Sequence, residues 1–166
     1  CIRAMASLPD CVYLLLPGMG ALRESCMDLA VWLGVMDRVR FPGYISDMGP
    51  WYQAADCAVT SSRSEGLPFN VMEAMYMELP VVASEVKGHV DLVRRGENGF
   101  LFPWGDADAC AQAVASLYAD PALCRAMGRA GADAVESYRL ERVLPQVLEA
   151  YGMVLPGIQT PAQAAV

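Results

Sequence analysis

Short apolar runs alternate along this chain with longer segments in which apolar residues recur every three or four positions. Runs of the first kind are typical of strands buried in a parallel sheet, and segments of the second kind are typical of helices. The runs predict strands at Cys11–Leu16, Val39–Phe41, Asp56–Thr60, Pro80–Ala83 and Gly99–Phe102. Strands and helices that alternate at this spacing indicate βαβ units. We therefore expect an α/β fold in which a mostly parallel sheet carries helices on both faces.

The helical segments have recognisable starts and stops. Between Leu22 and Leu33 the apolar residues recur at helical spacing, and Gly34 then supplies a helix stop. Pro68 suits the first turn of another helix, which we expect to end at Met77. Further helices are predicted at Gly49–Ala55, at His89–Arg95, and from Asp106 to about Val154 with breaks near Pro121 and Gly131.

The length and the hydrophobic content suit a single domain. The chain has 166 residues, of which 55% are hydrophobic, enough to bury a core. We expect this domain to span residues 1–155, and residues 156–166, rich in Pro, Ala and Gln, to form a flexible tail. Cys1–Ser7 has the pattern of the tail of a helix, so we expect an incomplete first βα unit and a longer parent protein.

Charge and cysteine usage narrow the function classes. Twelve basic residues stand against 19 acidic ones, and the net charge of −7 without a dense basic cluster argues against nucleic-acid binding. No apolar run reaches the ~18 residues of a membrane helix, and no signal-peptide pattern is visible. The six cysteines and one histidine include no Cys-x-x-Cys pair, so we expect no zinc site. Cysteines inside apolar segments favour buried thiols in a reducing, cytoplasmic setting over disulfides.

Ligands of parallel sheets bind beyond the carboxyl ends of the strands. The loops predicted there are Pro17–Ala21, Pro42–Ser46, Ser61–Pro68, Ser84–Val90 and Pro103–Asp106. In the first of them, Gly18 and Gly20 match the start of a dinucleotide-binding fingerprint, but Arg23 occupies the position of the third glycine. The sequence therefore gives little support to a nicotinamide or flavin site, and a glycine turn that a ligand can approach is the better interpretation.

Two carboxylates frame the segment Ser64–Glu73. Glu73 lies in a helix that is apolar on almost every side, so we expect it to be largely buried and to need partners. A structural hydrogen bond and a pair of ribose hydroxyls are both open interpretations. Glu65 precedes the helix, where it either favours the helix dipole or hydrogen-bonds a sugar. The amides of Gly66–Asn70 either merely begin the helix or receive a phosphate or sugar oxygen.

The remaining polar residues favour structural interpretations. The single histidine, His89, is expected at the surface or at a helix start, and Lys87 and Asp91 beside it are expected to be exposed. Asp106 and Asp108 suit the cap and first turn of a helix. The ten methionines are expected to fill the core, and no Ser/His/Asp set can be assembled.

Several segments also follow one another in a characteristic order. The central one runs from Ser62 to Pro68 and continues through Glu73-Ala74-Met75 to Leu79–Ser84. It is flanked by Leu14–Arg23, Asp37–Tyr44 and Asn98–Asp106. Together these segments resemble the retaining GT-B glycosyltransferases of group 1 (GT4). The resemblance implies a Rossmann-like three-layer domain, which forms the C-terminal, donor-binding half of such enzymes.

The resemblance also implies roles for individual residues. Glu73 matches the glutamate that holds the ribose of a nucleotide-sugar, and Glu65 matches the catalytic glutamate that faces the donor sugar. The loop whose amides meet the sugar and the diphosphate corresponds to Gly66, Leu67, Pro68 and Phe69. The base is held where Phe41, Pro42 and Gly43 lie, and the glycine turn corresponds to Gly18 and Gly20. Enzymes of this type need no metal, so we expect no cofactor beyond the donor substrate.

The implied reaction moves a sugar from a UDP- or GDP-sugar to a glycan or lipid-linked acceptor with retention, in polysaccharide biosynthesis. The acceptor would be bound by an N-terminal domain outside this chain, so we expect the chain alone to bind nucleotide weakly and to transfer nothing. The full protein is expected in the cytoplasm, and a peripheral contact with the inner face of the membrane is compatible with this expectation. A non-catalytic nucleotide-binding or scaffolding domain is the alternative, and a nicotinamide-dependent oxidoreductase is a distant third.

Overall fold

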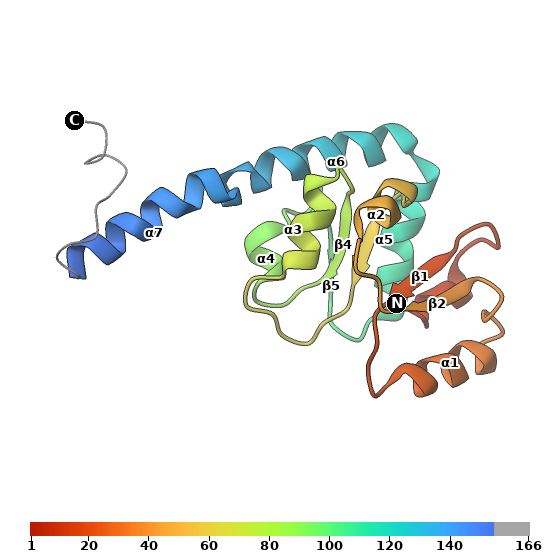
Figure 1. Ribbon diagram of the computed structural model, residues 1–166. Helices are drawn as coiled ribbons and strands as arrows, with labels where there is room; N and C mark the ends of the chain where they lie inside the picture. The colour runs from red at the N-terminus through yellow and green to blue at the C-terminus, as the bar shows by residue number, and fades with distance from the viewer. Residues whose placement is uncertain (155–166) are drawn as a thin grey trace.

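A computed structural model describes residues 1–154, in which strands and helices alternate (Figure 1). The strands are β1 (Leu14–Pro17), β2 (Val39–Gly43), β3 (Ala58–Thr60), β4 (Val81–Ser84) and β5 (Gly99–Phe102). The helices are α1 (Arg23–Trp32), α2 (Gly49–Ala54), α3 (Phe69–Tyr76), α4 (His89–Leu92), α5 (Ala107–Ala119), α6 (Pro121–Val135) and α7 (Leu140–Val154), with 3₁₀ turns η1 (Ala4–Ser7) and η2 (Glu136–Tyr138). The predicted tail, residues 156–166, lies outside the described residues.

All strand pairs in residues 1–154 are parallel, and the strands are divided between two sheets. In the first sheet β1 pairs with β2, and Leu14 lies opposite Val39. In the second sheet β4 lies between β3 and β5, so that Val59, Val82 and Phe100 form one row. The predicted α/β fold with parallel strands is confirmed. The expected single sheet is divided in two between β1 and β3.

Helices cover both faces of the β3–β4–β5 sheet, as the alternation of its side chains requires. Val82 and Phe102 pack in one buried cluster with Cys110 of α5. Their neighbour Val81 points to the other face and packs in a second buried cluster with Met75 of α3. Figure 1 shows α3 and α4 on one side of β4 and β5, and α5 on the other. This arrangement gives the three layers expected of the fold.

β1 begins at Leu14 and not at the predicted Cys11, because a buried arginine holds the preceding segment in turns. The guanidinium of Arg38 donates from Nη2 to the Met5 carbonyl and from Nη1 to the Pro9 carbonyl, both at 3.0 Å. The Val12 amide also donates to the Pro9 carbonyl, at 3.0 Å. The backbone groups of this segment are therefore satisfied by turns and by Arg38, although its side chains are apolar enough for a strand.

α1 ends at the predicted stop. Gly34 has φ +69°, a left-handed conformation that costs glycine little. Its amide donates to the Val31 carbonyl at 3.0 Å, and the Val35 amide donates to the Ala30 carbonyl at 2.9 Å. This pair of bonds is a Schellman motif, which satisfies the last carbonyls of the helix.

The predicted helix break at Pro121 is confirmed, whereas the one at Gly131 is wrong. α6 starts at Pro121 and continues through Gly131 to Val135, where η2 follows. A Cβ on Gly128 would overlap the carbonyl oxygen of Glu78 just beyond α3, and a Cβ on Gly131 would lie 3.5 Å from Met75 Cγ. Gly128 therefore serves the close approach of α6 to the end of α3, and neither glycine interrupts α6.

Candidate functional site

The loops that follow β3 and β4 pack directly on each other. Gly88, just before α4, has φ +87°, and a Cβ on it would lie 2.8 Å from the Gly66 carbonyl oxygen and 2.9 Å from Glu65 Cβ. A side chain at position 88 would force the two loops apart. Glu65 is half-buried at this contact, whereas Gly66 and Leu67 remain exposed.

A buried histidine supports the same pair of loops. His89 begins α4, as one of the two interpretations of the sequence has it, but its side chain is fully buried, so the expected surface position is wrong. Its Nδ1 lies 2.8 Å from the Ser84 carbonyl oxygen, which can only accept, so Nδ1 carries the proton. The Ser84 hydroxyl donates to the Ser62 carbonyl at 2.7 Å and thereby ties β4 to the Ser61–Pro68 loop. The Nε2 atom of His89 has no hydrogen-bond partner within the described residues.

The first turn of α3 keeps free hydrogen-bond donors. Its N-cap residue is Pro68, which is buried and supplies no side-chain cap. The Val71 and Met72 amides donate to the Pro68 carbonyl at 3.1 and 3.2 Å, which leaves the amides of Phe69 and Asn70 without a partner in residues 1–154. Free amides at a helix start attract anions because they coincide with the positive end of the helix dipole.

Glu73 is exposed, so the expectation that it is largely buried is wrong. Val71, Ala74 and Met75 form the buried side of α3, while Phe69 and Tyr76 are 68% and 51% exposed. The helix looks apolar all round in the sequence because aromatic side chains occupy its exposed side.

A tyrosine from another helix holds the Glu73 carboxylate. The Tyr52 hydroxyl, on α2, donates to Glu73 Oε2 at 3.1 Å. Burial and then the neighbouring Glu73 carboxylate raise the pKa of Tyr52 to about 12. The hydroxyl therefore keeps its proton at neutral pH and fixes one carboxylate oxygen, while the carboxylate retains capacity to accept from a ligand.

The glycine turn after β1 is bonded to the end of β2. Gly18 has φ +122°, and its amide donates to the Gly43 carbonyl at 2.7 Å. Arg23, at the start of α1, donates from Nη2 to the Phe41 carbonyl at 3.4 Å and lies 6.0 Å from the Phe41 ring centroid. The residues predicted to hold a base, Phe41, Pro42 and Gly43, therefore lie beside the predicted glycine turn, which contains Gly18 and Gly20.

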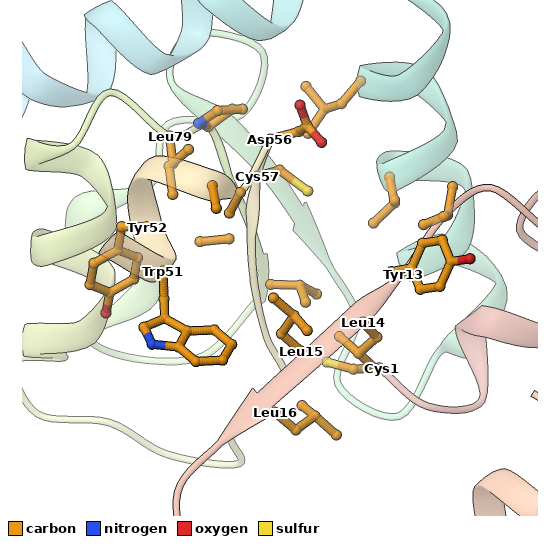
Figure 2. A pocket seen from close by; sticks show the side chains of 18 of the residues that line it. Cys1, Tyr13, Leu14, Leu15, Leu16, Trp51, Tyr52, Asp56, Cys57 and Leu79 are labelled. Atoms are coloured by element: carbon orange, nitrogen blue, oxygen red, sulfur yellow. The ribbon is translucent and has the colours of Figure 1, made fainter. Parts of the chain in front are cut away.

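A cavity of about 1290 Å³ lies between β1 and β3. We call it the inter-sheet cavity. Figure 2 shows Leu14, Leu15 and Leu16 in succession along β1, with Trp51 and Tyr52 of α2 on another side. Glu73 and Gly18 contribute to its lining, whereas Glu65 and the loop from Gly66 to Phe69 do not.

The structure thus groups the predicted site residues in three places. Glu65 and Gly66 lie against Gly88, Glu73 is bonded to Tyr52, and the glycine turn is bonded to Gly43. Sequence reasoning missed Tyr52, since no local pattern couples it to a residue 21 positions away. It also missed Arg63, whose guanidinium lies 5.1 Å from the Trp104 ring centroid, beside the loop after β5. The functional roles of the predicted residues stay predictions.

Two features are not found in residues 1–154. Within this range no three His, Cys, Asp or Glu side chains are grouped so as to hold a metal ion. No helix in the same range combines the length and the apolar character needed to cross a membrane. The expectation that the site works without a metal or cofactor stays a prediction.

Comparison with known proteins gives matches over most of the chain. A family model described as "Glycosyl transferases group 1" matches residues 1–120. LpsE of Rhizobium meliloti, a lipopolysaccharide core biosynthesis glycosyltransferase, is 40% identical over 122 residues, which are 74% of this chain and 36% of LpsE. EpsD of Bacillus subtilis is 38% identical over 138 residues, which are 83% of this chain and 36% of EpsD. The chain therefore spans about a third of the length of these curated relatives.

Solved structures agree with the fold. HepE of Anabaena in complex with UDP-glucose superposes with a TM-score of 0.86 at 27% identity. The superposition covers 92% of this chain and 44% of the HepE chain. HepE has also been solved with UDP and glucose.

Proposed function

The chain belongs to the group 1 glycosyltransferase family, and from this premise we propose that it is the donor-binding half of a sugar transferase. The complete enzyme moves a hexose or amino-sugar from a UDP- or GDP-sugar to a glycan or lipid-linked acceptor, with retention of configuration. The UDP-glucose bound by HepE favours a uridine donor. The role of LpsE in lipopolysaccharide core biosynthesis favours a glycan acceptor, bound by polypeptide outside this chain.

The position of Glu73 carries this proposal. Glu73 is exposed, its carboxylate is fixed on one side by Tyr52, and it lies in the second turn of a helix whose Phe69 and Asn70 amides have no partner among the described residues. Glu73 follows Asn70 by about 4.5 Å along the helix axis. One short segment therefore offers acceptors for two ribose hydroxyls and donors for the neighbouring phosphates. In this proposal those amides, and not a metal ion, meet the diphosphate.

Glu65 is proposed to face the transferred sugar. It lies in the loop that leads to the free amides of α3, and the contact with Gly88 holds its backbone. A carboxylate beside the anomeric carbon stabilises the positive charge that develops there when the bond to the diphosphate breaks. The loop from Gly66 to Phe69 is proposed to contact the same sugar and diphosphate through its amides.

Nucleotide titration of the chain tests the ribose role. We expect UDP or GDP to shift the NMR signals of Glu73, Phe69 and Asn70. Glu73→Ala should weaken binding about 10- to 150-fold, because hydrogen bonds to a charged acceptor contribute roughly 1.5–3 kcal/mol. Glu141→Ala, an exposed glutamate in the first turn of α7, is the matched control and should leave the affinity unchanged. Equal affinity of Glu73→Ala and the wild-type chain would refute the role.

The roles of Glu65 and Glu73 can be distinguished by comparing the binding of UDP with that of UDP-glucose. Glu65→Gln should leave the affinity for UDP unchanged and remove any gain in affinity of UDP-glucose over UDP. If the wild-type chain binds no nucleotide while remaining folded, the scaffolding alternative is favoured. Sugar transfer by the isolated chain at ordinary enzyme rates would contradict the proposed division of labour.

A further inference from the structure

The loops that follow β3, β4 and β5 are tied together at the carboxyl ends of these strands. The start of the loop after β4 is bonded to the loop after β3, because the Ser84 hydroxyl donates to the Ser62 carbonyl at 2.7 Å. It is bonded to the end of β5 by the Glu85 amide, which donates to the Phe102 carbonyl at 2.7 Å. β4 lies between the other two strands, so the loops after β3 and β5 start about 10 Å apart. Side chains of the three loops therefore share one short edge of the sheet.

An arginine and a tryptophan meet across this edge. The guanidinium of Arg63, in the loop after β3, lies 5.1 Å from the ring centroid of Trp104, in the loop after β5. A guanidinium that stacks on an aromatic ring is held in place while the N–H groups on its edge stay available. The hydrogen bonds and ion pairs that arginine side chains make within residues 1–154 do not include Arg63. The structure thus positions this guanidinium without using its donors.

A second cation belongs to the loop after β4. Lys87 is exposed and directly precedes Gly88, whose backbone packs against Glu65. Neither Lys87 nor Glu65 takes part in an ion pair within the part of the chain that the structure describes. These two packed loops therefore carry two cations outside ion pairs, Arg63 and Lys87, against one such carboxylate, that of Glu65.

The remaining carboxylates of this edge have partners of their own. Glu85, after β4, accepts from Arg95 at 3.3 Å. Asp106, after β5, accepts from the Ala109 amide at 2.8 Å and so caps α5, where the helix dipole favours a negative charge. The surplus of one positive charge is local, since the whole chain has a net charge of −7. A surplus of that size matches a ligand group with a single negative charge, such as a carboxylate.

The proposed donor site leads toward this cluster. Glu73, proposed to hold the ribose, lines the inter-sheet cavity on the β1 side of β3. Glu65, proposed to face the transferred sugar, packs against the loop after β4. Trp104 follows β5, which lies one strand further along the sheet. A donor with its ribose at Glu73 and its sugar at Glu65 therefore directs the far end of that sugar toward Arg63 and Trp104.

We propose that Arg63, held against Trp104, and Lys87 bind the carboxylate of an acidic transferred sugar, so that the donor is a nucleotide-linked uronic acid. Arg63 and Lys87 contact this carboxylate, whereas Trp104 is a positioning residue that acts through Arg63. The guanidinium offers two parallel N–H groups, which match the two oxygens of a carboxylate. The inference rests on the proposed function and narrows the transferred hexose to one that carries an acidic group.

Three nucleotides test this in the chain as it is: UDP, UDP-glucose and UDP-glucuronate. UDP-glucuronate has a carboxylate in place of the hydroxymethyl group of the glucose, so its comparison with UDP-glucose isolates the acidic group. We expect the wild-type chain to bind UDP-glucuronate about fivefold more tightly than UDP-glucose at low salt, the upper range for an exposed ion pair. The preference should fade as the salt rises from about 0.01 to about 1 M, because the Debye length falls from about 30 to about 3 Å.

Variants assign this preference to residues, and the affinity for UDP reports in each of them whether the nucleotide site is intact. Arg63→Gln should remove most of the preference, whereas Arg63→Lys, which keeps the charge without the planar fork, should retain part of it. Trp104→Leu releases the guanidinium and should reduce the preference about twofold. Arg129→Gln, at an exposed arginine of α6, is the matched control and should keep the whole preference.

The outcomes separate this inference from the proposed function. Equal affinity for UDP-glucuronate and UDP-glucose, with UDP bound at Glu73 and the start of α3, would overturn the inference and leave the proposed function standing. A preference that survives in Arg63→Gln would place the carboxylate elsewhere and would also overturn it. Methyl glucuronide that shifts the Trp104 indole NMR signal in saturating UDP-glucose, without a preference among the donors, would move the acidic sugar to the acceptor and contradict the assignment. If the folded chain binds none of the three nucleotides, the proposed function fails and this inference fails with it.

Discussion

Ionisation of Tyr52 should lower the stability of the protein at high pH. Burial, and then the Glu73 carboxylate that accepts its proton, raise the pKa of Tyr52 from 10.0 to about 12. Because the pKa of the folded state lies above that of the unfolded state, the stabilisation is complete below pH 10. It is lost as the pH rises through about 12, when the folded protein also gives up the proton.

The magnitude is modest because the hydroxyl is only half-buried. The difference between the two pKa values corresponds to about 2.7 kcal/mol. Solvent screening reduces the expected contribution to about 1 kcal/mol. That is a fifth or less of the ~5–15 kcal/mol free energy of unfolding of such domains, and equilibrium unfolding can measure a change of this size.

The assay compares urea unfolding of the wild-type chain and Tyr52→Phe at a pH below 10 and at a pH near 12. We expect the free-energy difference between the two proteins to change by about 1 kcal/mol between these conditions. Other tyrosines and cysteines titrate in both proteins and cancel. Tyr44→Phe, at a side chain that is 75% exposed, is the matched control. A difference between wild type and Tyr52→Phe that does not depend on pH would refute the bond from Tyr52 to Glu73.

Three further predictions concern packing around the site. Gly128→Ala should destabilise the fold by about 1–3 kcal/mol, because the new Cβ overlaps the carbonyl oxygen of Glu78 after α3. Gly131→Ala should be neutral or stabilise α6 by up to about 1 kcal/mol. Equal urea midpoints of the two variants would contradict this. Gly88→Ala should cost about 1–3 kcal/mol and shift the NMR signal of Glu65 before any ligand is added, so an unchanged Glu65 signal would refute the loop contact. His89→Leu leaves a buried carbonyl without its donor and should cost about 1–3 kcal/mol, while His89→Asn should recover part of the loss; equal losses would show that the hydrogen bond is unimportant.

Local signals in the sequence predicted the elements well. β5 has the predicted bounds, and Gly34 ends α1 because a left-handed glycine is itself the stop signal. The prediction is less accurate where distant residues compete for the same backbone. The start of β1 is shifted by Arg38, and α6 continues through Gly131 because packing against α3 outweighs the weak helix preference of one glycine.

The sequence identified the residues of the candidate site better than it predicted their exposure and contacts. The segment from Glu65 to Glu73 is visible in the sequence, but exposure of Glu73 depends on Phe69 and Tyr76 lying on the open side of α3. A composition argument assigns such aromatic residues to the core. The burial of His89 was likewise hidden, because its partner is a backbone carbonyl, which every residue possesses.

The division of the sheet has a consequence for the proposed donor site. The predicted base-binding residues Phe41–Gly43 belong to the β1–β2 sheet, whereas Glu65 and Glu73 follow β3 in the other sheet. In the proposed function a nucleotide contacts both groups, so its affinity should depend on the separation of the two sheets, across which Tyr52 of α2 is bonded to Glu73 of α3.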